Sequence, residues 1–456
     1  MTLREAGSVP WTATPGALDS TARQRVLSEL AVAALPSPRD IPVAELERMS
    51  LVDVVWLFLT PTGPLSSGTA LAACRVLMKA ATARLPAMLK AGGLQAAIAA
   101  LKAHPSSLEV AYESTRCLAV LSNAPGVAVQ CTEPASLSVI VATLTRYLTN
   151  EDVCKHVCLV LAYAAEVDER AKDACCAAAL PLIIRVIFQH AASPYTMTSA
   201  LCVLTHFINE RPSSRAAAVA CGATPIVARL LPRYATTRNH VLLFHMCNVL
   251  RALTVDCELE QADFVVEGGG MQALLRVLDG ATGRAAGAAA CLLTNVFVSR
   301  SAVSAASLLH IAGAPVIVGA LRRNVDDDVI AYALANVIMR LVQSSEGAKG
   351  VLVAAGAIPS LIAVLRLHAP SGAPDTVAFI CQCLSCIACP YHGGSWAAEI
   401  AAGGTTVALA ETARRRLAAA APEAAQAAIM LIGLICALSG PVPGCGCGCA
   451  GEGTAH

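Results

Sequence analysis

A glycine-containing corner between two apolar helical segments recurs along this chain, and it limits the fold more than any other feature. Its clearest copy is AAGAIPSLIAVLR at 354–366. Gly356 stands where a helix ends, because glycine readily adopts the left-handed backbone of that position, and Pro359 suits the first turn of the next helix. A period of roughly 43 to 47 residues, as seen here, indicates stacked helical repeats. Related corners begin at Lys90, Cys221, Glu267 and Ile311.

A column of small residues, each followed by an aliphatic segment, shows the same periodicity. Its members recur at intervals of about 41 to 48 residues, which predicts eight or nine repeat units. Most members are cysteines, and a thiol packs in a core much as a small apolar side chain does. We therefore expect most of the 20 cysteines to be free and buried. The column consists of Cys74, Cys117, Cys158, Cys202, Cys247, Cys291, Ala335, Cys383 and Ala428.

Polar loops precede the long third helix of each repeat. Hydroxyl, amide or acidic residues stand there, at Ser107, Asn150 and Ser193 for example, and their oxygens can accept hydrogen bonds from free helix amides. The three aspartates at 326–328 are a further case, with partner binding as the alternative to a capping role.

The composition indicates a folded chain, since 56% of the residues are hydrophobic and only 14% are charged. The net charge of +1 gives no general attraction for nucleic acid or anionic lipid, so we expect partner proteins and no nucleic acid. The N-terminus lacks the charged-then-apolar pattern of a secretory signal. We therefore predict a cytoplasmic location and a reducing compartment.

The repeat pattern does not extend to the ends of the chain. Thr21–Leu35 and Ile41–Leu59 each predict one helix, with two prolines between them. We interpret these helices as an N-terminal cap or a degenerate first repeat. The predicted layout is a flexible arm over 1–20, capping helices over 21–65, the repeat array over 66–440 and a flexible Gly- and Cys-rich tail over 441–456.

Three helices per repeat, with a Gly-Ala corner before an aliphatic second helix, resemble the armadillo repeat family. The most specific matches are GATP at 222–225, GAP at 313–315 and GAIP at 356–359, whereas the units near Leu137 and Leu180 lack the glycine. The resemblance implies an all-α fold, a right-handed α-solenoid of about eight to nine armadillo-type repeats. It also implies that the third helices line a concave groove that binds proteins and carries no catalytic centre.

The family's known binding modes match this chain only in part. Nuclear-import members clamp basic peptides with a ladder of Trp and Asn, but Trp11, Trp56 and Trp396 are the only tryptophans here and none has the required spacing to an Asn. Catenin-like members have a strongly basic groove, whereas the third helices here carry a mixed, weakly polar set. From repeat phase, the residues expected to face a partner are Arg116, Asn123, His156, His206, Asn248, Arg251, Asn295, Asn336 and Arg340.

Two roles remain open for such an array. The favoured role is a non-enzymatic adaptor that binds partner proteins along the groove. The alternative is a structural component of a cytoskeletal assembly associated with tubulin, such as the axoneme of a cilium or flagellum. The glycines at 268–270 form a repeat corner without the flanking residues of a phosphate-binding loop, so we expect no enzyme and no cofactor.

Two cysteine clusters could carry chemistry of their own. The run CQCLSCIACP at 381–390 superficially resembles a metal-ligand motif, but it falls within the helical pattern, so core thiols are favoured over a metal site. Cys445, Cys447 and Cys449 alternate with glycines in the tail, where disorder, acylation and soft-metal binding are alternatives. The apolar helix at 424–438 is too short for a tail anchor, so we expect a terminal repeat helix there and membrane contact only through acylation.

Overall fold

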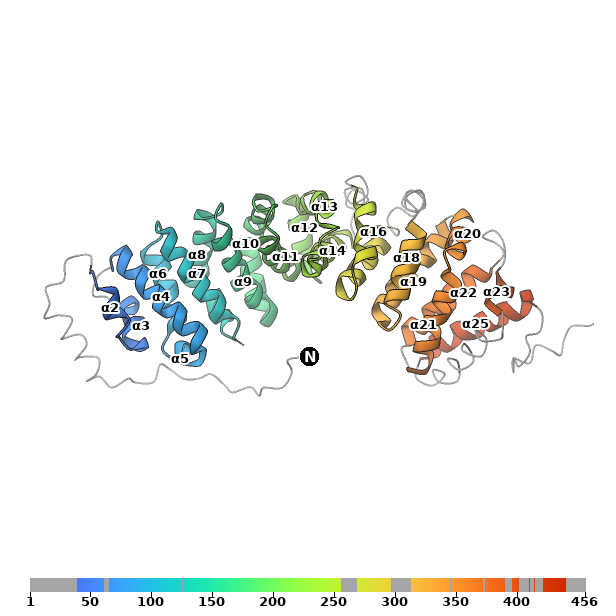
Figure 1. Cartoon of the computed structure of the whole chain (residues 1–456), viewed down its shortest axis with the longest axis horizontal. Coiled ribbons are helices and arrows are strands. Elements are labelled where there is room, and N and C mark those ends of the chain that lie inside the picture. Colours follow the sequence, from blue (N-terminus) through green and yellow to red (C-terminus); the bar gives the residue numbers. More distant parts are fainter. Residues whose placement is uncertain are drawn as a thin grey trace, which may run out of the picture. The chain divides into compact units, whose positions relative to one another are not determined.

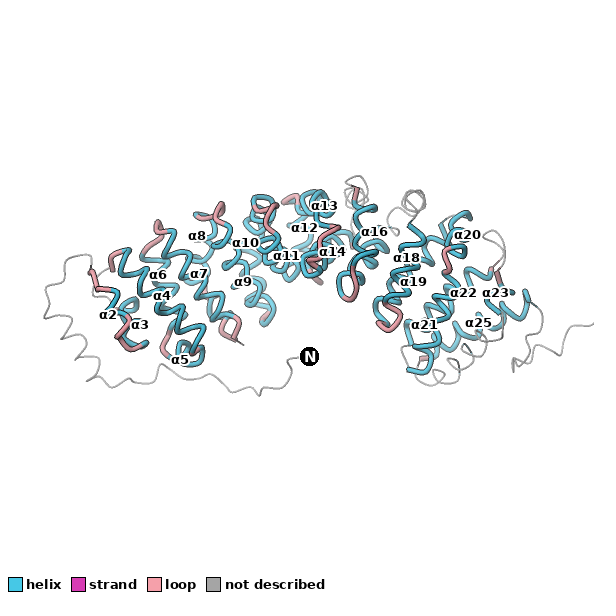
Figure 2. Tube along the Cα trace, viewed as in Figure 1, coloured by secondary structure: helices cyan, strands magenta, loops and turns pink. Residues whose placement is uncertain are grey.

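A computed structural model describes residues 39–439 except the segments 61–64, 125, 256–268, 297–312, 345, 372–373, 390–395, 402–409, 411–413 and 415–420. The predicted arm, the predicted helix over Thr21–Leu35 and the predicted tail with its three cysteines lie outside the described residues. The chain forms two compact units, Met1–Ala128 with Pro134–Thr143 (unit 1) and Val129–Glu133 with Leu144–His456 (unit 2). Figures 1 and 2 show both as helices joined by loops.

Unit 1 packs α4 against α7 and α3 against α6. The single helix predicted over Ile41–Leu59 is wrong, because the structure divides it into two. The hydroxyl of Ser50 accepts a hydrogen bond from the amide of Asp53 (3.3 Å) and so starts a second helix at Leu51. The helices are α2 (Val43–Leu46), α3 (Leu51–Leu59), α4 (Ser67–Ala83), α5 (Leu85–Lys90), α6 (Gly93–Ala103), α7 (Leu108–Ser122) and the start of α8 (Pro134–Arg146).

Unit 2 is built around its long third helices, which pack in succession: α9 on α11, α11 on α14, α19 on α22 and α22 on α25 (Figure 1). A further third helix covers 284–296. The bounds are α9 (Glu151–Val167), α10 (Glu169–Gln189), α11 (Pro194–Ile208), α12 (Pro212–Ala220), α13 (Ala223–Tyr234), α14 (His240–Thr254), α16 (Gly270–Gly280), α18 (Gly313–Arg323), α19 (Asp328–Ser344), α20 (Glu346–Ala354), α21 (Ala357–Ser371), α22 (Pro374–Ala388), α23 (Ala397–Ala401) and α25 (Pro422–Ser439).

Four of the five predicted glycine corners are confirmed, at Gly92, Gly222, Gly269 and Gly356, and the fifth begins at Ile311, outside the described residues. Gly222, Gly269 and Gly356 have φ angles of 77°, 76° and 88°, a region that other residues adopt only at a cost. Of the two units that lack the glycine, the one near Leu137 still has a break between a short 3₁₀ helix, Ala128–Thr132, and α8, whereas the one near Leu180 has no corner. Residues 169–189 form the single helix α10, which runs through Pro181 and replaces two separate helices of the repeat.

The predicted caps of the third helices are also present. Side-chain oxygens of Ser107, Asn150, Ser193 and Asn239 accept hydrogen bonds from the amides three residues later. Within the aspartate run, Asp327 accepts from the amide of Ile330 at 3.0 Å. Each cap satisfies one of the free amides that a helix start leaves exposed.

The column of small residues lies in the core, as predicted, with two exceptions. Cys117, Cys158, Cys247, Ala335 and Cys383 are 0% exposed, and Cys74 and Ala428 are buried as well. Burial raises the pKa of the Cys74, Cys117 and Cys247 thiols to about 12, so these thiols stay protonated and inert. Cys202 and Cys291 are half-exposed, and this places them on the surface of their third helices.

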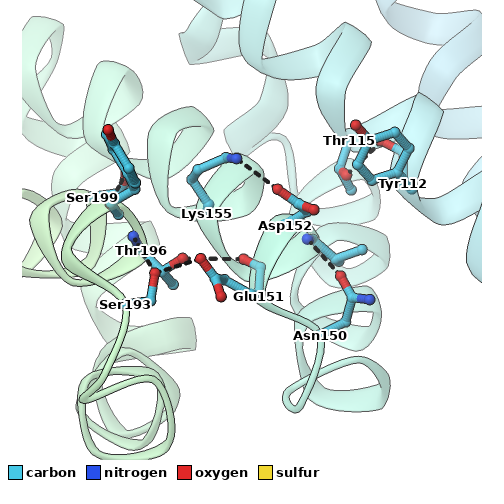
Figure 3. A network of polar contacts seen from close by, with 11 residues as sticks. Tyr112, Thr115, Asn150, Glu151, Asp152, Lys155, Ser193, Thr196 and Ser199 are labelled. Atoms are coloured by element: carbon cyan, nitrogen blue, oxygen red, sulfur yellow. Dashed lines mark hydrogen bonds and ion pairs between the residues drawn. The ribbon is translucent and has the colours of Figure 1, made fainter.

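Hydrogen bonds between neighbouring repeats supplement the apolar packing. His190 contacts the carbonyl of Leu148, Tyr234 donates to the carbonyl of Ala191, and His368 contacts the carbonyl of Val325, at 2.6 to 2.8 Å. Between α9 and α11 a second set joins the helix starts, where the Ser193 hydroxyl donates to the Glu151 carboxylate and the Thr196 hydroxyl donates to the Glu151 carbonyl (Figure 3). These bonds fix the register of each repeat on the previous one.

Candidate protein-binding face

The third helices of unit 2 leave one side only partly covered. Along each helix the half-exposed positions recur every three or four residues, so they lie on one side of that helix. We call this set the third-helix face. It is defined by the exposed Arg284 and by the half-exposed Lys155, Tyr163, Cys202, His206, Phe244, His245, Asn248, Arg251, Cys291, Asn295, Tyr332, Asn336, Arg340, Phe379 and Cys386.

Around α14, polar side chains of this face hydrogen-bond to one another and to neighbouring repeats. The Arg251 guanidinium donates to the side-chain oxygen of Asn248 at 2.9 Å and to that of Asn209 at 3.4 Å. From the following helix, the Asn295 amide donates to the carbonyl of Arg251 at 3.0 Å and to the Thr254 hydroxyl at 3.3 Å. Three consecutive repeats are thereby joined through polar side chains.

Around α19 the same residue types are arranged differently. Asn336 and Arg340 lie one turn apart on α19, and neither the buried Asn336 Oδ1 nor the buried Arg340 Nε has a hydrogen-bond partner among the described residues. One turn earlier, Tyr332 packs its ring against Phe379 of α22, with centroids 4.8 Å apart. Polar groups with unmet hydrogen-bonding capacity therefore lie beside an aromatic pair.

A third cluster joins α11, α14 and the helix over 284–296. The Arg284 guanidinium lies 4.3 Å from the ring centroid of Phe244, and the Phe244 ring meets that of His245 edge to face at 5.0 Å. Burial, His206 and Arg284 lower the pKa of His245 to about 4. Burial also lowers the pKa of His206, against an opposing effect of Glu166.

Six of the nine residues predicted to face a partner lie half-exposed on this face, at His206, Asn248, Arg251, Asn295, Asn336 and Arg340. In unit 1, Arg116 is exposed and pairs with Glu113 at 3.8 Å, and Asn123 caps the exposed end of α7. His156 is 7% exposed, so its side chain is buried, which does not favour the predicted contact with a partner.

Sequence reasoning missed Arg284, His245 and the aromatic residues Phe244, Tyr332 and Phe379. Phe244 and Tyr332 stand at the same distance from the capping residues of their helices, Asn239 and Asp327. Aligning the repeats on these capping residues, instead of on the cysteine column, would have placed both aromatic residues on the face.

The cysteine run of α22 divides between core and surface. Cys381 and Cys383 are buried, and burial raises the pKa of the Cys381 thiol to about 12. Lys349 is buried, and its ammonium group donates a hydrogen bond to the Cys389 carbonyl. This places a positive charge beside the run. Among the described residues, no three His, Cys, Asp or Glu side chains come together as ligands for a metal ion.

Helix length and hydropathy bear on the expectation that the chain contacts a membrane only through acylation. Within the described ranges, no single helix is long and apolar enough to span a bilayer, and one helix pair, Gly347–Ala354 with Ala357–His368, reaches the required length across a bend of 68°.

No family model and no curated protein gives a match to this chain. Several solved structures match it. An engineered protein shares 19% identity at a TM-score of 0.63, covering 92% of this chain and 96% of its own. A chain from a structure of the interaction between cadherin and β-catenin shares 17% identity at a TM-score of 0.64, covering 86% of this chain and 70% of its own.

A designed armadillo repeat protein also matches, with 17% identity and a TM-score of 0.43 over 54% of this chain. The fold assignment rests on the two longer matches, together with the glycine corners and the stacked third helices. The chain is an all-α solenoid of the armadillo type.

Proposed function

We propose that this chain is a non-enzymatic protein-binding scaffold that holds an extended segment of a partner protein on its third-helix face. The observation that carries the proposal is that Asn336 Oδ1 and Arg340 Nε, on a half-exposed helix surface, have no hydrogen-bond partner within the described part of the chain. A buried polar atom without a partner costs about 1 to 3 kcal/mol, and a bound polypeptide would remove that cost. The β-catenin match supports a protein-binding role by likeness of fold.

An extended polypeptide has the chemistry that this part of the face lacks. Its backbone amides can donate to the Asn336 oxygen, and its carbonyl or carboxylate oxygens can accept from the Arg340 guanidinium. Its apolar side chains can cover the rings of Tyr332 and Phe379. Because such contacts recur from repeat to repeat, the affinity would come from accumulated surface contacts.

Affinity capture with a matched control tests this function. The full chain is tagged, and the proteins it retains from its own cells are compared with those retained by the double variant Asn336→Ala with Arg340→Ala. The control is Arg366→Ala, an exposed arginine on the second helix α21 of the same unit. We expect the double variant to lose partners that the control keeps. Equal retention by all three chains would contradict the proposal.

The cytoskeletal role is a separate proposal that rests on the neutral, alanine- and cysteine-rich composition alone. It predicts that the chain stays with tubulin-rich, detergent-resistant material when cells are extracted. Release into the detergent-soluble fraction with a few defined proteins favours a cytoplasmic adaptor instead.

A further inference from the structure

Arg284 presents a positive charge on the third-helix face that no carboxylate in the described part of the chain neutralises. Its side chain is exposed, and its guanidinium carbon lies 4.3 Å from the ring centroid of Phe244. A guanidinium over an aromatic face is attracted to the ring and still carries several N–H donors. Arg284 therefore offers a positive charge and hydrogen-bond donors to an acceptor on this face.

His245 adds a second unsatisfied group next to this arginine. Its ring meets the ring of Phe244 edge to face, and its buried Nδ1 has no hydrogen-bond partner among the described residues. His206 on the neighbouring helix α11 is close enough to disfavour protonation of His245. Three nitrogen-bearing side chains from three successive repeats thus lie in one region.

Charged groups on α9, α10 and the helix over 284–296 act on this region. Glu166 of α9 raises the pKa of His206, whereas Lys172 of α10 lowers it. Burial and Glu166 raise the pKa of the Cys202 thiol, and Arg284 lowers it. Burial and the neighbouring cations lower the pKa of both histidines, so they are neutral near pH 7. Glu166 is the acidic group that acts on both His206 and Cys202.

We propose that Arg284, His245 and His206 form a subsite for an acidic side chain of the polypeptide bound on the third-helix face. The proposal rests on the protein-binding function given above and names the chemistry of the partner. A carboxylate or phosphoryl group can accept two parallel hydrogen bonds from the guanidinium, and a third from an imidazole. The arriving negative charge also favours the protonated imidazole, so binding should take up protons and strengthen as the pH falls below neutral.

A peptide selection on the full chain tests the subsite. A library of random extended peptides is displayed and selected on the wild-type protein and, in parallel, on Arg284→Gln. We expect peptides with an Asp or Glu at one fixed position to be enriched on the wild type and lost on the variant. One enriched peptide is then synthesised with Glu, phosphoserine or Gln at that position, and each affinity is measured by fluorescence anisotropy.

The expected ranking is acidic above neutral, by about tenfold for the Glu peptide over the Gln peptide. Arg284→Gln removes this preference, and Glu166→Gln increases affinity for the acidic peptides because it removes the one opposing charge. Arg276→Gln, an exposed arginine on the second helix α16, is the control and should change nothing. The phosphoserine peptide shows whether a dianion is preferred to a single carboxylate.

Three outcomes contradict the proposed subsite, and they differ in what they say of the broader function. Enrichment of neutral or basic peptides, with binding that depends on Arg340 but not on Arg284, contradicts the acidic subsite and leaves protein binding on the face intact. Failure of the wild-type chain to select any peptide contradicts both. Binding of the Glu peptide that stays constant as the pH is lowered would remove the two histidines from the subsite.

Discussion

The third-helix face around α14 and the same face around α19 carry the same residue types, yet the structure uses them in opposite ways. On α14, Asn248 and Arg251 stand three residues apart and bond to each other, and Arg251 also reaches Asn209. On α19, Asn336 and Arg340 stand four residues apart, and an atom of each has no hydrogen-bond partner among the described residues. The same two residue types therefore form a self-contained structural link on α14 and a surface that can receive a partner on α19.

Acidification should separate the two regions most strongly. The pKa of His245 is lowered to about 4, so between about pH 6.5 and 4 the unfolded chain binds a proton that the folded chain does not. Stability therefore falls as the pH falls through this window, by at most about 3 kcal/mol, with a smaller contribution of the same sign from His206. Helices α19 and α22 contain no histidine.

Urea unfolding near neutral pH and at acid pH measures this difference when it is combined with amide exchange for individual helices. We expect protection in α14 to decrease on acidification more than protection in α19, and His245→Gln to remove most of that difference. Equal loss of protection in both helices would mean that His245 does not control the response.

Paired alanine substitutions provide a second test. Asn295→Ala removes two hydrogen bonds to the preceding repeat and leaves the Arg251 carbonyl without that donor, so it should lower the free energy of unfolding by about 1 to 2 kcal/mol. Asn336→Ala removes an amide whose oxygen has no partner in the described ranges, and it should cost less than about 0.5 kcal/mol. Denaturant unfolding of both variants gives the two values, and similar losses would contradict the distinction.

The smallest effect concerns the backbone that holds Asn209 in reach of Arg251. Glu210, the next residue, has a φ of 59°, which glycine adopts at no steric cost. Glu210→Gly should therefore raise the free energy of unfolding by about 0.5 kcal/mol while the Arg251 bonds remain. The same unfolding assay measures it, and a loss of stability would show that the Glu210 side chain contributes contacts of its own.

Much of the fold could be predicted because its signals are local. A glycine at Gly222 or Gly356 is sufficient to place a corner, and a polar residue such as Asn150 is sufficient to start a helix. The candidate site was harder. His156 was assigned to the exposed side from repeat phase alone, and the cysteine column drifts relative to the helix starts, so the same phase points to different sides in different repeats.

The sequence by itself determined the period, the corners, the buried thiols and the helical class, because each follows from the conformational preference or hydrophobicity of single residues. The tertiary structure decided which polar groups find partners. Whether Arg251 and Arg340 are satisfied depends on the side chains that neighbouring repeats bring within about 3 Å, and residues such as Arg251 and Asn209 lie 42 positions apart in the chain. Packing between repeats, which no local pattern encodes, therefore selects the surface available to a partner.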